Sequence, residues 1–469
     1  MSEPAAPNVA YPEITGTLRE RTAAAVADTE LGGNLSRASA SFHAGRQRMK
    51  DEQGFDGMRD RASAIRRSNI AKLPELIARL EENARAAGTT VVRASDGAEA
   101  CRYIGELAAA RGAKVIAKSK SMATEEIKLN EHLQDQGLKV IETDLGEWIL
   151  QLAGQHPSHI IAPAVHLNKS QVRELFEAES GRPLPLDREA LVAHARLRLR
   201  EQFAAADIGI SGVNMAVAET GTICVVENEG NGRLVTGLPR IHVAVMGIER
   251  VVENWEEAAH LLQVLPMAAI GDDAATYVNL ITGPRREGEG DGPEELHLVI
   301  LDGGRSVLRG TEFEEALACI RCGACLYACP MWRSVGGQAY GSPYSGPIGA
   351  VITPLLEGFN GKTSNELPFM SSLCGGCHEA CPVGIPLHDL LVKARAVINA
   401  KPEQGATERR MFHLWATAWR NPVLYRLSVR AARLGMRVLG PRGWAKRAPG
   451  PGRHWTDERD LMTQWPPRP

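Results

Sequence analysis

Seven of the nine cysteines in this 469-residue chain are concentrated in two short runs. The first run reads ACIRCGACLYACP, the second reads SSLCGGCHEACP, and both end in Cys-Pro. Aligned on those ends, the runs supply Cys319, Cys322, Cys325 and Cys329, then Cys374, Cys377 and Cys381, with Ser371 in the remaining place. Thiols gathered in this way are typical of a metal-ligand set and differ from the scattered cysteines of a disulfide scaffold. We therefore expect a metal centre and a reducing compartment.

The spacing C-x2-C-x2-C-x3-C-P is the pattern of bacterial ferredoxins, in which three close thiolates bind one [4Fe–4S] cluster and the fourth reaches another. The fourth cysteine lies a helical turn further on, beyond the reach of the same iron. The spacing therefore predicts two [4Fe–4S] clusters with exchanged ligands. We assign Cys319, Cys322, Cys325 and Cys381 to cluster 1, and Cys329, Cys374 and Cys377 to cluster 2.

The fourth ligand of cluster 2 stays open at this point. Ser371 could ligate through its oxygen, stand beside an iron that binds water or a partner's group, or leave a three-iron cluster. His378 is a further candidate, although a hydrogen-bonding role is commoner for a single histidine in such a loop.

The alternative to iron and sulfur is zinc, because pairs of C-x2-C also describe zinc ribbons. One zinc site would use four thiolates and leave three unexplained, whereas the crossed scheme uses all seven, so we favour iron–sulfur. The other two cysteines, Cys101 and Cys224, lie among apolar residues and are expected to be small buried side chains.

Length and charge limit the classes of protein to consider. A chain of this size should form two or three domains. Its net charge of −2 gives no reason to expect nucleic-acid binding. The N-terminus has no secretory leader pattern and no apolar run is long enough to span a membrane. We expect a cytoplasmic protein whose membrane contact is at most peripheral.

Residues 58–305 alternate short β-branched runs with helical stretches, which predicts a largely parallel α/β sheet covered by helices. Expected strands occupy 89–94, 114–119, 138–144, 159–165, 215–230, 240–248, 275–283 and 295–304. Before them, residues 1–57 form an arm or a few surface helices. After them come the cysteine region, 306–400, which should be mainly helical, and a basic tail, 401–469, with helical apolar spacing and five of the eight tryptophans.

Polar residues at the expected strand ends mark the default pocket, since open α/β sheets bind ligands beyond the carboxyl ends of their strands. Lys118 and Lys120 could hold a carboxylate or a phosphate, against the simpler interpretation of solvated lysines. His166, His242 and His297 lie near strands and are weak candidates for a base. No dinucleotide or P-loop motif occurs, and the sequence identifies no catalytic residue.

The chain resembles the lactate-utilisation iron–sulfur protein B family from about residue 60 to 395. The resemblance rests on KSKSMATEEIKLN, ETDLGEWILQLAG, HIIAPAVH, GISGVNMAVAETGTICVVENEGNGRL, HVAVMGIE, LITGPR, GPIGAVITPLL and the two cysteine runs. It implies an α/β domain related to the ribose-5-phosphate isomerase and CoA-transferase-like folds, followed by a ferredoxin-like dicluster domain. It also implies seven cluster cysteines, in agreement with the assignment above.

The function expected from the resemblance is that of an electron-transfer subunit in a complex that oxidises L-lactate to pyruvate. Its partners would be the other subunits and an unidentified electron acceptor. Two other hypotheses stay open: an enzyme whose α/β domain acts on a phosphorylated or CoA-linked carboxylate with regulatory clusters, and a zinc-containing scaffold. The basic tail could dock an acidic subunit or an anionic membrane, and we favour the subunit because Asn421-Pro422 interrupts the helix.

Overall fold

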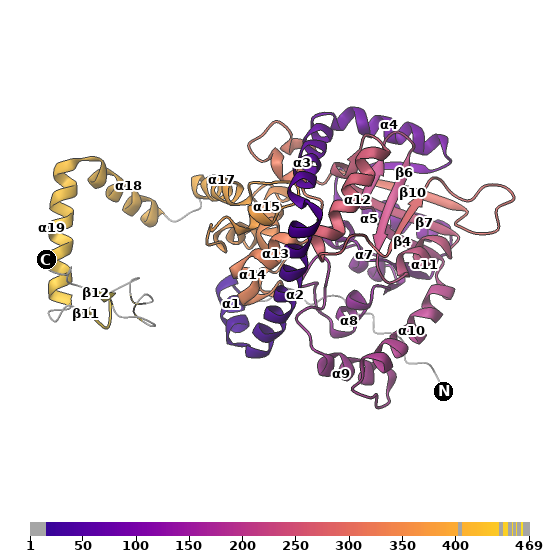
Figure 1. Cartoon of the computed structure of the whole chain (residues 1–469), viewed down its shortest axis with the longest axis horizontal. Coiled ribbons are helices and arrows are strands. Elements are labelled where there is room, and N and C mark those ends of the chain that lie inside the picture. Colours follow the sequence, from indigo (N-terminus) through magenta and orange to yellow (C-terminus); the bar gives the residue numbers. More distant parts are fainter. Residues whose placement is uncertain are drawn as a thin grey trace. The chain divides into compact units, whose positions relative to one another are not determined.

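The computed structural model describes residues 16–401, 406–439, 444–448, 453, 456 and 461–462. It divides into two compact units, one ending at Arg395 and one beginning at Ala396. The first unit contains the six-stranded and four-stranded sheets and both cysteine runs (Figure 1). No helix among the described residues is long and apolar enough to cross a membrane.

A six-stranded parallel sheet is the centre of the first unit, with strand order β1-β10-β7-β4-β2-β3. Its strands are β1 (Thr90–Ala94), β2 (Val115–Lys118), β3 (Lys139–Glu142), β4 (Ile208–Gly212), β7 (Ile241–Gly247) and β10 (Glu295–Leu301). Because all six are parallel, their carboxyl ends lie along one edge. A second, mixed sheet of order β8-β5-β6-β9 is built from β5 (Met215–Val217), β6 (Thr222–Glu227), β8 (Val251–Val252) and β9 (Tyr277–Ile281).

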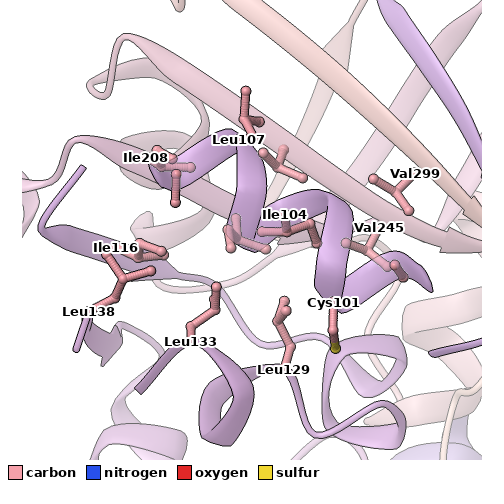
Figure 2. Close-up of a cluster of buried hydrophobic side chains, with 14 of the residues drawn as sticks. Cys101, Ile104, Leu107, Ile116, Leu129, Leu133, Leu138, Ile208, Val245 and Val299 are labelled. Carbon is pink, nitrogen blue, oxygen red and sulfur yellow. The ribbon is translucent and has the colours of Figure 1, made fainter. Parts of the chain in front are cut away.

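Helices connect and cover the sheets, as parallel strands require. They are α4 (Leu73–Ala86), α5 (Gly97–Ala110), α6 (Met122–Glu126), α7 (Leu129–Asp135), α8 (Leu145–Ala153), α9 (Lys169–Ser180), α10 (Arg188–Ala205), α11 (Asn231–Gly237), η1 (Ile248–Arg250) and α12 (Trp255–Ala269). Figure 2 shows one of the cores that result, where α5 and α7 pack against the strands. Cys101 of α5 is 3% exposed in that core, and Cys224 of β6 is completely buried, as expected for both.

The N-terminal segment forms three helices: α1 (Leu18–Ala27), α2 (Thr29–Gln53) and α3 (Phe55–Ala71). Figure 1 shows α2 and α3, in indigo, running between the sheets and the cysteine region. Helix α2 contacts α13 and α14 of the cysteine region, and α3 contacts both α12 and η3. These helices therefore join the two halves of the first unit.

The cysteine region consists of short helices. They are η2 (Ser306–Leu308), η3 (Glu314–Ala318), α13 (Ala324–Ala328), α14 (Pro330–Val335), η4 (Gln338–Tyr340), α15 (Gly346–Leu356), η5 (Ser364–Phe369), α16 (Gly376–Ala380) and α17 (Leu387–Ala400). The second unit contains α18 (Ala406–Arg420), α19 (Pro422–Leu439), β11 (Trp444–Ala445) and β12 (Leu461–Met462). The helix does break before Pro422, where the Asn421 side chain accepts from the Val423 and Leu424 N–H groups.

The predicted fold class is confirmed: an α/β domain with a parallel sheet, then a mainly helical cysteine region and a helical C-terminus. The expected strand at 159–165 is wrong, because these residues form bends and turns. The residue just before the apolar run, Ser158, is bonded to the cysteine region and, among the described residues, to no neighbouring strand. The Ser158 carbonyl accepts from Trp332 Nε1 at 3.3 Å and from Ser345 Oγ at 3.0 Å. His159 and Ile160 of the run are buried, and His159 contacts Tyr327 of the cysteine region, so an apolar segment at this contact imitates the composition of a core strand.

Two further differences concern the sheets. Strand β4 was not among the expected strands, although it lies in the centre of the parallel sheet. The Asn-Glu-Gly-Asn-Gly segment, residues 228–232, has the composition of a hairpin turn, yet it leads into α11, with Gly230 at φ +82° as its N-cap. A glycine in the left-handed region serves either structure, so the local sequence did not distinguish them.

Candidate functional site

The two cysteine runs fold into loops with the same pattern of left-handed backbone. The first has Arg321 at φ +59° and Gly323 at φ +75°, and the second has Leu373 at φ +55° and Gly375 at φ +83°. Non-glycine residues rarely adopt positive φ, so each loop is held in this shape by its surroundings. In both loops the left-handed turns bring successive cysteines onto one side of the chain ahead of a one-turn helix.

Those one-turn helices, α13 and α16, pack against each other. Their last residues are followed by Cys329 and Cys381, so each helix delivers one cysteine toward the other run. As a result one cavity is lined by thiols of both runs: Cys319, Cys322, Cys325 and Cys381. The structure therefore brings together the four residues that the spacing assigned to cluster 1.

The other three cysteines form a second group. Burial raises the pKa of Cys377 to about 12, and the nearby thiols of Cys329 and Cys374 add to that shift. Burial raises the pKa of Cys329 as well, with Cys374 contributing. Mutual effects of this kind require the three sulfur atoms to be close neighbours. The three residues assigned to cluster 2 thus lie together.

The donor set fits iron–sulfur clusters. Burial raises the pKa of Cys322 to about 12, and Cys381 adds to the shift, so these crowded thiols need a compensating cation before they can act as thiolates. Cluster iron supplies that compensation, and [4Fe–4S] clusters take thiolate ligands in sets of four. Within the described part of the chain, no three His, Cys, Asp or Glu side chains converge on a point that would hold a single metal ion.

The candidates for the eighth ligand lie at the edge of the second group. Ser371 Oγ accepts from the Leu373 N–H at 3.1 Å, and its carbonyl accepts from Arg395. The His378 Nδ1 lies 3.0 Å from the Ile385 carbonyl, which is the hydrogen-bonding role that was favoured for it. Neither geometry selects a ligand.

Three arginines of the N-terminal helices, which sequence reasoning passed over, hold the cysteine loops by their backbone carbonyls. Arg46 donates to Ala380 at 2.7 Å, and Arg59 donates to Cys381 at 2.8 Å. Arg66, 2% exposed, donates to Ala318 and Leu317 just before the first cysteine, and to Glu249 and Val251 of the α/β domain. Guanidinium groups suit this task because they present several donors in a fixed fork.

A second cavity, of about 220 Å³, lies at the carboxyl edge of the parallel sheet, where the strand-end rule places a ligand. Its lining follows the edge from β3 to β10: Asp144, then Lys120 and Ser121, then Gly212 and Asn214, then Glu249 and Arg250, then Arg305. The cysteine region closes it with Arg321 and Tyr344, and α12 adds an apolar wall that includes Leu265 and Ala269.

A buried ionic network forms the side of this cavity nearest the cysteines. Arg305 donates to both oxygens of Glu126 and lies 2.8 Å from Glu249. Tyr344 donates to Glu126 at 2.7 Å. The Arg321 guanidinium lies over the Tyr344 ring, 4.7 Å from its centroid. Although burial opposes its charge, Arg305, Arg250 and Arg321 hold the pKa of Glu249 at about 2. A side chain on Gly247 would collide with both Glu249 and Arg305, so this pair depends on a glycine there.

The other side of the cavity is acidic, because Asp144, Glu227 and Glu229 line it. The structure on this side corrects the expectation for Lys118. Lys118 is fully buried and bonded to Glu125 and Glu142, so it is internally neutralised and does not line the cavity. Lys120 does line it, donating to the Ile161 carbonyl at 2.6 Å and lying 3.3 Å from Asp144. Of the two lysines, only Lys120 is placed to meet a ligand.

None of the three histidines considered as bases lines this cavity. Burial lowers the pKa of His242 to about 3, and its ring pairs with Ser211 inside the sheet. Burial lowers the pKa of His166 to about 4, and its Nε2 bonds Gln155. His297 lies between Tyr103 and Glu295. These are packed histidines, in agreement with their rank as weak candidates for a base.

Comparison with known proteins places these observations in a class. Residues 77–301 match the LUD domain and residues 315–385 match the 4Fe-4S dicluster domain. The chain is thus a LUD-domain iron–sulfur protein.

Curated relatives narrow the class to one family. Lactate utilization protein B of Shouchella clausii is 46% identical over 88% of this chain and 86% of its own length. The protein of the same name from Bacillus pumilus is 44% identical over 94% of each chain. The chain therefore belongs to the lactate utilization protein B family, as its sequence motifs indicated. A solved DUF162 family protein from Deinococcus radiodurans aligns with 49% of this chain and 98% of its own at 15% identity and a TM-score of 0.27, too low to carry an argument.

Proposed function

We propose that the chain is an iron–sulfur electron-transfer subunit of a complex that oxidises L-lactate to pyruvate. The observation that carries the proposal is the placement of the two thiol groups. The group with Cys322 is buried beside the cavity of the LUD domain, whereas the group with Cys374 reaches the surface. The names of the curated relatives support lactate utilisation as the process.

In this proposal the thiolates of Cys319, Cys322, Cys325 and Cys381 hold one cluster, and those of Cys329, Cys374 and Cys377 hold a second whose fourth position is open. A [4Fe–4S] cluster, when bound, accepts and passes on one electron at a time. The surrounding residues exclude water from the inner thiols and fix their backbone, chiefly through Arg46, Arg59 and Arg66.

The chemistry of the process can use such a relay. Conversion of L-lactate to pyruvate releases two electrons and two protons, and single-electron carriers must take the electrons in turn. The inner group is placed to receive electrons from the α/β side, and the outer group to deliver them to a partner. The partners are the other subunits of the complex and an electron acceptor.

The experiment is iron and acid-labile sulfide analysis of anaerobically purified protein, with electron paramagnetic resonance of the reduced state. We expect about eight irons per chain and two interacting reduced clusters. Addition of L-lactate together with the partner subunits should then generate the reduced signal. Zinc without iron, or loaded clusters that lactate never reduces in the presence of the partners, would refute the proposal.

A further inference from the structure

Arg321 separates the two cavities of the first unit. It lines the thiol cavity together with Cys319 and Cys322, and it also lines the cavity at the sheet edge together with Arg250 and Tyr344. Its position in the chain, between two of the cysteines, places one wall of the sheet-edge cavity directly on the cysteine loop.

The guanidinium of Arg321 is buried and short of partners. The residue is 6% exposed, and its two terminal nitrogens have no hydrogen-bond partner among the described residues. The closest carboxylate oxygen, of Glu249, is 3.5 Å away, which is long for a hydrogen bond. Buried donors without partners are costly, so this group is poised to gain from an anionic acceptor.

The charges around it leave room for that acceptor. Three guanidinium groups, of Arg250, Arg305 and Arg321, share the carboxylates of Glu126 and Glu249. Arg305 donates to both oxygens of Glu126 and lies 2.8 Å from Glu249, whereas Arg250 lies 3.7 Å from Glu249. Among these five groups one unit of positive charge is left over, at the end of the cavity formed by Arg250 and Arg321, while Asp144, Glu227 and Glu229 also line the cavity.

The second cysteine loop shows that the charge belongs to the cavity. Leu373 has the backbone conformation and loop position of Arg321, yet it is apolar and 36% exposed. A cluster loop of this shape thus forms without an arginine there. The charge on the first loop is explained by what lies across from it, at the carboxyl edge of the sheet.

Size and the opposite wall restrict the ligand. The cavity, at about 220 Å³, lies below the roughly 300–1,000 Å³ of pockets for drug-sized ligands. Leu265, Ala269 and Ile270 give it an apolar side. A small carboxylate with a short carbon chain satisfies both the guanidinium groups and this wall.

We propose that the sheet-edge cavity binds a small 2-hydroxy acid or its 2-oxo product, with Arg321 and Arg250 as the partners of its carboxylate. The choice of a hydroxy acid among small carboxylates rests on the proposed function. The ligand then lies against the loop that carries Cys319 and Cys322. Arg321 lines both the ligand cavity and the thiol cavity.

The test is isothermal titration calorimetry on the full-length, cluster-loaded protein under anaerobic conditions, with pyruvate, L-lactate, L-lactamide and inorganic phosphate as probes. We expect one site per chain for pyruvate or L-lactate. The neutral L-lactamide should bind at least about tenfold more weakly, because it cannot pair with a guanidinium group. Arg321→Gln and Arg250→Gln should each weaken pyruvate binding by roughly tenfold or more, and Arg333→Gln, an exposed arginine of α14, should not.

Arg250 lies outside the cysteine loops. Weaker binding in Arg250→Gln therefore reports a lost contact with the carboxylate and not a damaged cysteine loop. Iron and sulfide are measured on every sample, so failure of the proposed function is recognised by absent clusters. Loaded clusters with no carboxylate binding overturn this inference alone, as do tighter binding of phosphate, equal binding of L-lactamide, or unchanged affinity in both arginine variants.

Discussion

The two cysteine loops share their backbone conformation and differ in what surrounds them. In the first loop Cys322 is 6% exposed, Arg321 faces the sheet-edge cavity, and Gly323 touches the buried ring of His159. In the second loop Cys374 and Leu373 are exposed, and nothing lies within 4 Å of a side chain placed on Gly375. The same local structure has therefore been used once as an interior element and once as a surface element.

This difference teaches that the direction of the proposed relay is set by neighbours outside the loops. The α/β domain and the N-terminal helices cover the first loop, whereas Arg46 and Arg59 hold the second run at its end and leave Leu373 and Cys374 exposed. Electron transfer between proteins needs close approach, so an open group suits exchange with a partner and an enclosed group suits a bound ligand. Each prediction below compares a residue of the enclosed region with a matched residue elsewhere.

The largest effect is expected from the cysteines that cross between the runs. Cys381→Ser should alter the cluster of the first run, although Cys381 belongs to the second, because its thiol lines the first cavity. About half of the iron should be lost or altered. Resonance spectra of Cys381→Ser and Cys374→Ser should show opposite clusters affected, with Cys101→Ser as the unchanged control; damage to the same cluster in both would refute the crossed ligand sets.

The next largest effect is expected on the free energy of unfolding when Arg66, which bonds both halves of the first unit, is replaced. Arg66→Gln should destabilise the protein by roughly 3–5 kcal/mol, because buried carbonyls of both halves lose their donor. Arg61→Gln removes an exposed pair with Glu256 and should cost less than about 1 kcal/mol. Denaturant midpoints of the loaded proteins measure both; equal midpoints would show that Arg66 does not hold the halves together.

The glycines at matching positions should respond differently. Gly375→Ala incurs the left-handed backbone penalty of roughly 1–2 kcal/mol. Gly323→Ala adds a collision, since its methyl group would lie 2.8 Å from His159 Cε1, and the total should reach roughly 2–4 kcal/mol. Thermal unfolding of the two variants gives the comparison, and a smaller loss for Gly323→Ala would mean that the first loop is not enclosed.

The smallest effect concerns thiol reactivity after the iron is chelated. The Gly376 N–H lowers the pKa of the exposed Cys374, whereas burial raises the pKa of Cys322 to about 12. A lower pKa leaves more thiolate at neutral pH, so iodoacetamide should modify Cys374 at least about tenfold faster than Cys322 at pH 7. As the pH rises toward 9 the rate at Cys374 should level off, while Cys322 stays protonated. Peptide mass spectrometry follows each site, and similar rates at pH 7 would contradict the difference in burial.

The sequence predicted what depends on local spacing. The cysteine intervals, the alternation of strands and helices, and the family motifs led to the fold class and to both thiol groups. The strand end carrying Lys120 does border a cavity, as the strand-end rule predicted.

What the sequence did not predict depends on contacts between distant segments. Arg321 reads as an ordinary spacer between cysteines, and only the packing of the cysteine region on the sheet edge makes it a cavity wall. Lys118 and Lys120 are two residues apart, yet one is neutralised by Glu142 and the other faces the cavity. The run at 159–165 has the composition of a strand and is buried for a different reason, which burial periodicity cannot reveal. The one available signal was the difference between the two runs, since Leu373 occupies in the second run the place that Arg321 has in the first.

The most direct test is whether one thiol group is enclosed and the other open. It measures, by electron paramagnetic resonance, how strongly a soluble dysprosium chelate enhances the spin relaxation of each reduced cluster. The measurement uses Cys381→Ser, which should retain the cluster of Cys329, Cys374 and Cys377, and Cys374→Ser, which should retain the cluster lined by Cys319, Cys322, Cys325 and Cys381. We predict strong relaxation enhancement for the first variant and little for the second, because Cys374 of the outer group is exposed, whereas Cys322, Cys325 and Cys381 of the inner group are buried. Equal enhancement, or the reverse order, would contradict a relay that runs from an enclosed cluster beside the LUD cavity to an open cluster at the surface.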